Sequence, residues 1–199
     1  MSNRVLVIID FFNPSGFSDT PKLAGAALVA ARRTAALKVR LRQARVPVIY
    51  ANDNFGHWQS NFSTLVAICK RLSGEAGQIA DMLAPGPGDW SLLKPRHSAF
   101  YGTPLEFMLD ELGARSLVLT GVMTDSCITM TAADAHMRKF DVWIPRDCVA
   151  STSQERTRAA LVQLERVAGA KSGSSRSGGR AKVAKRTSMR PSFQSRSAG

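Results

Sequence analysis

Short apolar runs alternate along the chain with longer segments in which apolar residues recur every three or four positions. The apolar runs predict five strands, over residues 4–9, 47–51, 91–94, 116–120 and 142–145. The helical spacing and the start signals predict helices over residues 21–45, 64–72, 77–83, 104–112, 126–139 and 153–167. Strands that alternate with helices indicate a parallel sheet covered on both faces. The expected fold is therefore α/β, a three-layer, doubly wound and mainly parallel sheet.

The turn after the first strand argues against a dinucleotide-binding enzyme. It reads Asp10-Phe11-Phe12-Asn13 and contains no glycine. The Gly-rich fingerprint that brings a backbone close to a pyrophosphate is therefore absent there. No phosphate-cradling loop is found elsewhere in the sequence either.

The positive charge is concentrated at the carboxyl end of the chain. The 199 residues have a formal charge of +12, and residues 170–199 hold eight of the 27 Lys and Arg residues and none of the 15 acidic ones. Residues 1–169, which are expected to form the folded domain, therefore keep 19 basic and 15 acidic residues. The tail is rich in Ser and Gly, so we expect residues 170–199 to be disordered. It is either a non-functional extension or an arm that binds nucleic acid or another polyanion.

Cysteine content and hydropathy favour a cytoplasmic protein. The first strand begins at once, without a signal-peptide core, and no stretch of about 18 apolar residues predicts a membrane span. Three cysteines without regular spacing do not suggest a disulfide framework, so reduced thiols fit best. Cys69 lies in an apolar helix and is expected to pack in the core. Cys148 follows Asp147 at the end of the fifth strand, where it could reach the rim of a site, but structural packing is the expected role.

Cys127 follows the fourth strand, after Gly121 and a short polar turn, and opens an Ala-rich helix. The amides at a helix N-terminus stabilise negative charge, so a thiol there is a candidate nucleophile with a lowered pKa. A lone cysteine is also commonly a small buried apolar residue. Asp125, two residues earlier, is expected to cap this helix.

Two further chemical groups follow strands. Asp10 ends the first strand, and Lys94 ends the third. Either charge could be a solvated strand end. However, the carboxyl ends of parallel strands meet at one edge of the sheet, where ligands bind. An acid, a base and a thiol at equivalent places therefore predict a reactive site, in which Lys94 would lower the pKa of Cys127.

Three sequence blocks resemble the isochorismatase-like cysteine hydrolases, which include nicotinamidases, N-carbamoylsarcosine amidases and ureidoacrylate amidohydrolases. The blocks are residues 120–135 (TGVMTDSCITMTAADA), 93–105 (LKPRHSAFYGTPL) and 7–13 (VIIDFFN). The first two together are highly specific, and the likeness spans about residues 4–167. The resemblance puts the family's Asp-Lys-Cys triad on Asp10, Lys94 and Cys127.

The resemblance implies a reaction without a cofactor. A small carboxamide or ureido compound would lose its amine through a thioester on Cys127. The backbone amides of Met123 and Cys127 would form the oxyanion hole, beside a cis peptide between Val122 and Met123. The family also implies a homo-oligomer. An isochorismate-type ether hydrolase, which lacks the cysteine, and a non-catalytic binding protein on the same fold are the alternatives.

Two departures from the family affect the expected pocket. Nicotinamidases carry an Asp-x-His metal motif after the second strand, where this chain has Asp53 and then Phe55, with only His57 nearby. One His and one Asp make a poor first shell, so no metal is expected. The family's aromatic after the first strand is replaced by Ser15. Candidate substrate contacts are therefore Asn13, Phe17, Phe55, Trp58, His97 and Tyr101.

Overall fold

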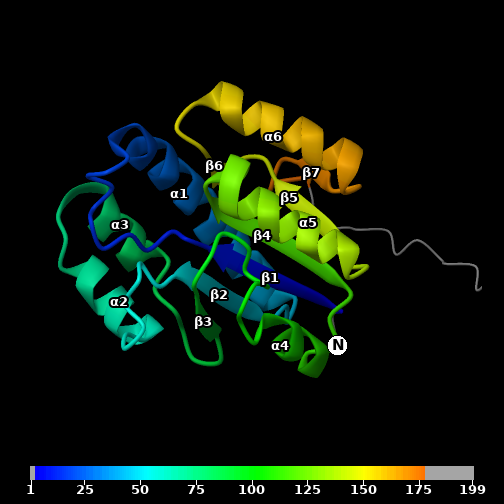
Figure 1. The fold of residues 1–199 in the computed structure, drawn as a ribbon, viewed down its shortest axis with the longest axis horizontal. Coiled ribbons are helices and arrows are strands. Elements are labelled where there is room, and N and C mark those ends of the chain that lie inside the picture. Colours follow the sequence, from blue (N-terminus) through cyan, green and yellow to red (C-terminus); the bar gives the residue numbers. More distant parts are fainter. Residues whose placement is uncertain (1–2, 178–199) are drawn as a thin grey trace, which may run out of the picture.

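A computed structural model describes residues 3–177, and residues 1–2 and 178–199 lie outside that description. Its sheet has the strand order β3-β2-β1-β4-β5-β7, with β6 paired to β4, and every pairing is parallel. The strands are β1 (Arg4–Ile9), β2 (Val48–Asp53), β3 (Trp90–Lys94), β4 (Ser116–Val122), β5 (Asp141–Pro145), β6 (Val149–Ala150) and β7 (Lys171–Gly173). Figure 1 shows the arrangement.

Six α-helices and one π-helical turn connect these strands within the described residues. They are α1 (Pro21–Gln43), α2 (Phe62–Lys70), α3 (Gly74–Met82), α4 (Leu105–Glu111), the π-helical turn η1 (Thr124–Ile128), α5 (Thr129–Met137) and α6 (Gln154–Val167). The predicted doubly wound α/β fold is confirmed, and each of the five predicted strands is present. Ser153 caps α6, because its side chain accepts a hydrogen bond from the backbone N–H of Arg156.

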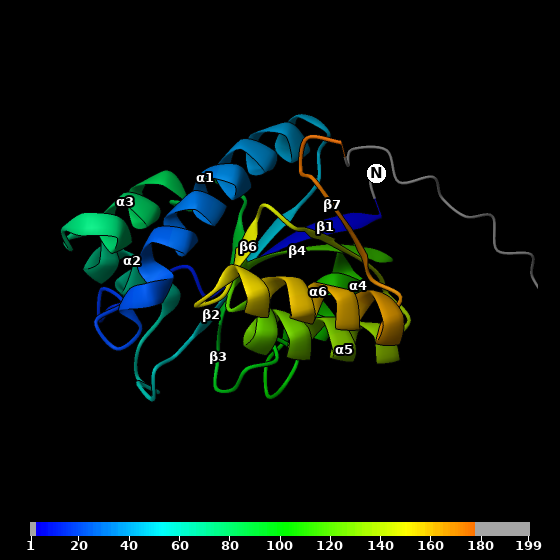
Figure 2. The same ribbon diagram turned by 90° about the horizontal axis from the view of Figure 1, so that it is seen from above.

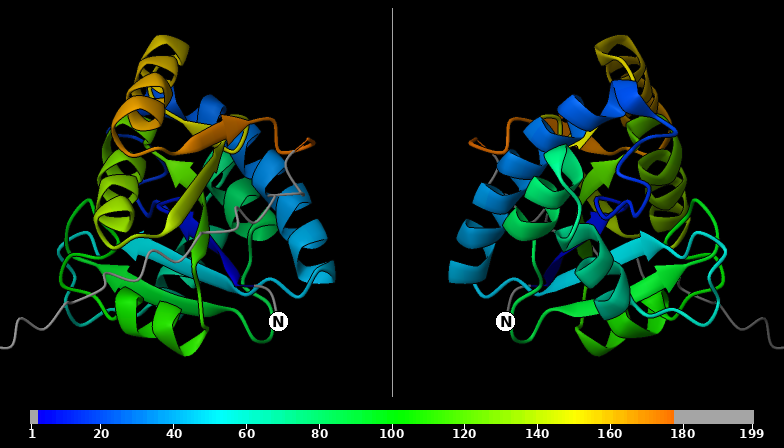
Figure 3. Two further views of the ribbon diagram at one scale, coloured as in Figure 1. Left: turned by 90° about the vertical axis from the view of Figure 1, so that its right-hand side faces the viewer. Right: turned by 90° about the vertical axis from the view of Figure 1, so that its left-hand side faces the viewer.

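Alternate strand residues build two separate cores, one on each face of the sheet. In β1, Leu6 and Ile8 pack with α1, α2 and α3, whereas Val5, Val7 and Ile9 pack with α4, α5 and α6. The two-residue period of a strand produces this division, and both faces are buried, as a parallel sheet requires. Figures 2 and 3 show the two helix layers on opposite sides of the sheet.

The four adjacent strands β3, β2, β1 and β4 bring their carboxyl ends to one edge of the sheet. Asp53 at the end of β2 is paired in register with Lys94 at the end of β3. Ile9 at the end of β1 is paired with Gly121 near the end of β4. Because the sheet order is β3-β2-β1-β4, the residues that end or follow these strands lie on four adjacent strands. This edge holds the candidate site.

The expected start of the disordered tail at residue 170 is wrong for its first part. Residues 171–173 form β7, which extends the sheet beside β5. Asp147 anchors the next residues, since it accepts hydrogen bonds from the backbone N–H of Ser175 at 2.7 Å and from its hydroxyl at 2.8 Å. The sequence did not predict this strand, because Lys, Ser and Gly carry no apolar pattern. The strand forms through its pairing with the backbone of β5. The rest of the predicted tail, residues 178–199, lies outside the described residues.

Within residues 3–177, no helix is both long and apolar enough to cross a lipid bilayer.

Candidate functional site

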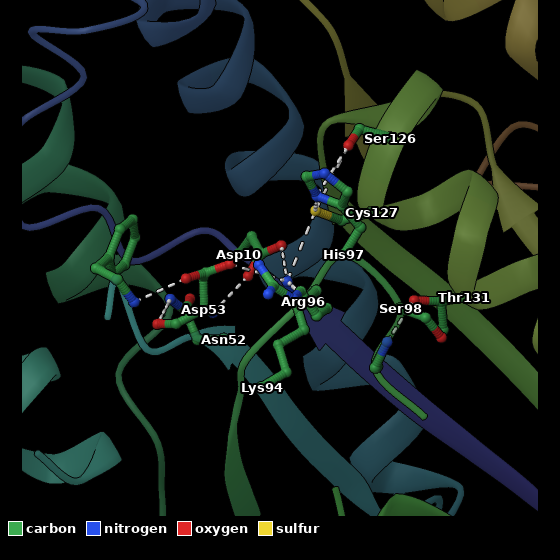
Figure 4. Close-up of polar contacts among 12 residues, drawn as sticks. Asp10, Asn52, Asp53, Lys94, Arg96, His97, Ser98, Ser126, Cys127 and Thr131 are labelled. Carbon is green, nitrogen blue, oxygen red and sulfur yellow. Dashed lines mark hydrogen bonds and ion pairs between the residues drawn. The ribbon is translucent and has the colours of Figure 1, made fainter. Parts of the chain in front are cut away.

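Lys94 is a fully buried cation at the end of β3. Strands lie about 4.8 Å apart, so β3 is roughly 10 Å from β1, and a lysine side chain is long enough to cross β2. Its Nζ reaches Asp10 Oδ2 at 2.8 Å, Cys127 Sγ at 3.6 Å and Asp53 Oδ2 at 3.6 Å. It also donates to the Arg96 carbonyl at 3.0 Å. The three groups predicted from the sequence therefore meet (Figure 4).

Asp10 lies in the left-handed region of backbone space, with φ of 53°. This conformation is unusual for a residue other than glycine, and here it ends the strand and turns the chain. Its Oδ1 accepts a hydrogen bond of 2.7 Å from the backbone N–H of Asp53. The next residues are held by Asn52, a buried side chain that bonds both the N–H and the carbonyl of Phe12, at 3.0 and 2.9 Å. Two residues of β2, Asn52 and Asp53, therefore hold the Asp10 carboxylate and the turn after it in place.

The Asp10–Lys94 pair is shielded from water. Burial raises the pKa of Asp10 above its ordinary value, which the nearby Lys94 ammonium only partly offsets. Burial also opposes the charge of Lys94, but Asp10 and Cys127 outweigh it and hold the pKa of Lys94 above its ordinary value. We take the ion pair as formed, because a buried ammonium 2.8 Å from a carboxylate needs that counter-charge.

Cys127 lies in η1, two residues before α5 begins, rather than at the start of an ordinary α-helix. Cys127 is 9% exposed. On the solvent side its Sγ lies 3.6 Å from His97 Nδ1 and 3.9 Å from Ser126 Oγ. His97 Nδ1 is in turn 3.3 Å from Ser126 Oγ. The thiol therefore sits between the buried Asp10–Lys94 pair and an exposed imidazole.

The expected lowering of the thiol pKa is wrong. Burial, together with the negative charge of Asp10, raises the pKa of Cys127 to about 12, and Lys94 offsets only part of this. The sequence showed a lysine near the thiol, but it could not show that a carboxylate shares the charge of that lysine or how deeply the thiol is buried. The burial of the thiol therefore means that a base must remove its proton before it can react.

Asp125 does not cap the helix as expected, since η1 has no side-chain cap. Its carboxylate instead accepts a 2.6 Å hydrogen bond from Ser151 Oγ and pairs with Arg156 Nη2 at 2.5 Å. Burial opposes ionisation of Asp125, but the bonds from Ser151 and Arg156 outweigh it and hold its pKa below the ordinary value. The contacts tie η1 to β6 and α6.

The peptide between Val122 and Met123 is cis, as the resemblance implies. The Met123 carbonyl accepts hydrogen bonds from the backbone N–H groups of Ser126 and Ile128, both at 3.2 Å. These bonds fold the chain back on itself between β4 and η1. The turn thereby keeps the backbone of Met123 close to that of Cys127.

A cavity of about 370 Å³ adjoins the Asp53 side of this cluster. Its walls include Asp53, Phe55, His57 and Leu93. Within residues 3–177, no group of three or more His, Cys, Asp or Glu side chains is placed to hold a metal ion. Phe55, which stands where the family's metal motif has histidine, lines the cavity with a hydrocarbon ring. These residues do not fit the metal centre of that motif.

The other candidate substrate contacts divide by position. Phe17 is wrong as a pocket wall, because it is 1% exposed and packs in the core beside α1. Asn13 Oδ1 accepts hydrogen bonds from the N–H and hydroxyl of Ser15 and so shapes its own turn. Trp58 and Tyr101 are 78% and 64% exposed. Only Phe55 of this group lines the cavity, and His97 contacts the thiol instead.

Sequence reasoning missed three features of the site. Asp53 was considered only as the remaining aspartate of an incomplete metal motif, but it pairs with Lys94. Asn52 was not singled out, although a polar side chain at the end of an apolar strand is a usable signal. Ser126 was also passed over, and its hydroxyl lies between His97 and Cys127. A larger groove, of about 830 Å³, runs between α1 and α6, and none of Asp10, Lys94 and Cys127 lines it.

Residues 4–174 match the family model described as the Isochorismatase domain. The fold and this match place the chain in the isochorismatase family, as a hydrolase of that family with amidase relatives.

The chain is 36% identical over 166 residues to the isochorismatase family protein YaaI of Bacillus subtilis (strain 168). The aligned stretch covers 83% of this chain and 91% of YaaI. A shorter stretch of 62 residues is 47% identical to the ureidoacrylate amidohydrolase RutB of Methylorubrum extorquens, but it spans only 31% of this chain and 25% of RutB. The crystal structure of N-carbamoylsarcosine amidase from Thermoplasma acidophilum is also similar. It has 26% identity and a TM-score of 0.65, over 86% of this chain and 96% of that one.

Proposed function

We propose that this protein is a cysteine amidohydrolase that cleaves a C–N bond of a small carboxamide or ureido compound, with no cofactor. Cys127 is the nucleophile, Asp10 the base and Lys94 the group that holds the carboxylate. The observation that carries the proposal is the position of the Lys94 Nζ, 2.8 Å from Asp10 and 3.6 Å from the Cys127 sulfur. The amidase names of RutB and the T. acidophilum enzyme support the same reaction class.

In the first half-reaction the thiol proton leaves Sγ for the Asp10 carboxylate, whose pKa is raised by burial. The sulfur then attacks the carbonyl carbon of the substrate, and the electron pair of the C=O bond moves to its oxygen. The backbone N–H groups of Met123 and Cys127 stabilise this oxyanion. When the oxyanion collapses, the C–N bond breaks and the leaving nitrogen takes the proton.

In the second half-reaction water hydrolyses the thioester. Asp10 accepts a proton from the attacking water, the C–S bond breaks, and the thiol recovers its proton. The Lys94 ammonium stays charged throughout and limits how far Asp10 can move. The cavity beside Asp53 and Phe55 holds the rest of the substrate. Its volume of about 370 Å³ suits a small molecule.

An ammonia-release screen over small carboxamides and ureido compounds tests the proposal. We expect Cys127→Ala to abolish turnover of any hit, while Cys69→Ala, a matched cysteine in the core of α2, keeps it. Hydroxylamine added during turnover should divert the acyl group to a hydroxamate, because it attacks a thioester. Turnover by Cys127→Ala within tenfold of the parent protein would remove the covalent mechanism.

A further inference from the structure

His97 is the one titratable side chain that contacts Cys127 from the solvent side in the described structure. It lies three residues after Lys94, in the loop that joins β3 to α4, and its residue is exposed. Its Nδ1 is 3.6 Å from the Cys127 sulfur, a contact drawn in Figure 4. The imidazole therefore lies between the nearly buried thiol and the solvent.

The partners of the thiol differ in what they can accept. Lys94 is an ammonium and can only donate a hydrogen bond to sulfur. Asp10 approaches from the buried side, and both of its oxygens already accept other hydrogens, from Lys94 Nζ and from the Asp53 N–H. His97 Nδ1 is shared only with the Ser126 hydroxyl, 3.3 Å away. A neutral imidazole protonated at Nε2 presents a free lone pair to the thiol there.

We propose that His97 is a second proton acceptor for Cys127 and sets the reactivity of the thiol in the free protein. The S–H proton moves to Nδ1, which leaves a thiolate beside an imidazolium. The imidazolium can release its Nε2 proton to water, because the ring is exposed. Asp10 remains the base on the buried side, so the thiol has one acceptor on each side. This inference deepens the proposed function, since it rests on Cys127 as the nucleophile.

The charges around this contact favour the transfer. Histidine is the side chain that gains and loses a proton near neutral pH. The charged groups at this contact are Lys94 from β3 and Asp10 behind the thiol. Arg96 precedes His97 in the same loop and is exposed. The Lys94 ammonium, 3.6 Å from sulfur, stabilises the thiolate once it has formed. Ser126 Oγ contacts both His97 and Cys127. Its hydroxyl can therefore reorient when the proton moves from the thiol to the imidazole.

Alkylation kinetics test this role without any substrate. Iodoacetamide is neutral, and it forms an S–C bond with the thiolate as iodide leaves. We expect His97→Gln to slow alkylation of Cys127 at neutral pH by about tenfold or more and to change the pH profile of the rate, because glutamine cannot accept a proton. His136→Gln is the matched control, since His136 is exposed near the end of α5 and does not line the cavity. Mass spectrometry quantifies the Cys127 adduct.

Two outcomes would overturn the inference. His97→Gln could keep the parent rate and pH profile, which would leave His97 a packing residue. His97→Ala could react faster than the parent protein, which would show that the ring merely shields the sulfur. Ammonia release measured on the same preparations separates the two proposals. Alkylation that depends on His97 in a protein that hydrolyses no amide supports this inference and counts against the proposed function.

Discussion

Lys94 contributes to both stability and chemistry, because its fully buried ammonium faces two carboxylates. Removal of the cation leaves Asp10 and Asp53 without their counter-charge, so Lys94→Met should lower the free energy of unfolding by about 3 kcal/mol and abolish turnover. Urea unfolding measures the first effect. The double variant Asp10→Asn/Lys94→Met removes both members of the pair. It should be less destabilised than the sum of the single variants, and strict additivity would show that the two charges are not coupled.

At the scale of single residues, the sequence identified Asp10, Lys94 and Cys127 because each follows a strand and a parallel sheet gathers strand ends at one edge. It did not predict the state of the thiol. That state depends on burial and on the competition between Asp10 and Lys94, which no spacing reveals. His97 was expected near a substrate, and its contact with sulfur became visible only when the loop after β3 was placed against η1.

At the scale of elements, the turn from β4 into η1 depends on Gly121. Its φ of 134° lies outside the range that side chains tolerate, and an added β-carbon would lie 1.9 Å from the Ile9 carbonyl oxygen. Gly121→Ala should therefore destabilise the fold by about 3 kcal/mol or more and lower turnover, because β1 and β4 must separate beside Asp10.

Gly25→Ala is the control for this substitution. Gly25 is an exposed residue within α1, and nothing lies within 4 Å of an added β-carbon. Alanine there should raise stability by roughly 0.5–1 kcal/mol, because it restricts the unfolded chain and favours the helix. Thermal unfolding of both variants gives the comparison. A Gly121→Ala protein as stable as the parent would mean that β1 and β4 can move apart without cost.

Asp147 gives the segment after α6 a pH-dependent anchor. Burial opposes its ionisation, but the N–H and hydroxyl of Ser175 outweigh this and hold its pKa below the ordinary value of 3.8. The stabilisation is therefore present above pH 3.8 and is lost as pH falls through the folded-state pKa. Asp147→Asn should lower the urea midpoint at about pH 6, and the difference from the parent should shrink below 3.8. A difference that stays constant with pH would contradict the anchor.

The order of elements was predictable because apolar runs and helical stripes are local signals. Two strands escaped prediction for the same reason. β6 has only two residues, which are too few to show a strand pattern. β7 reads Lys-Ser-Gly and contains no apolar side chain. Both owe their place to pairing with strands already formed, β4 and β5. The π-helical turn that holds Cys127 was likewise hidden, since its sequence is compatible with an ordinary helix start.

At the scale of the whole molecule, charge separates the domain from its extension. Residues 178–199 hold six basic residues, Arg180, Lys182, Lys185, Arg186, Arg190 and Arg196, and no acidic ones. If these bind polyanions, a chain that ends at Ser177 should bind duplex DNA more weakly than the full chain at low salt. Each phosphate contact releases counterions, so the slope of log affinity against log salt should fall by up to about five units.

Truncation at Ser177 keeps β7 and the Ser175–Asp147 contacts, so stability and turnover should stay near those of the full chain. This choice of end point separates loss of charge from loss of fold. A full-length variant with the six basic residues changed to glutamine provides a matched control, since it has the same length without the charge. It should bind DNA as weakly as the truncated chain, because the expected interaction is electrostatic and independent of sequence. Equal DNA binding by all three proteins would show that the extension is not an electrostatic arm.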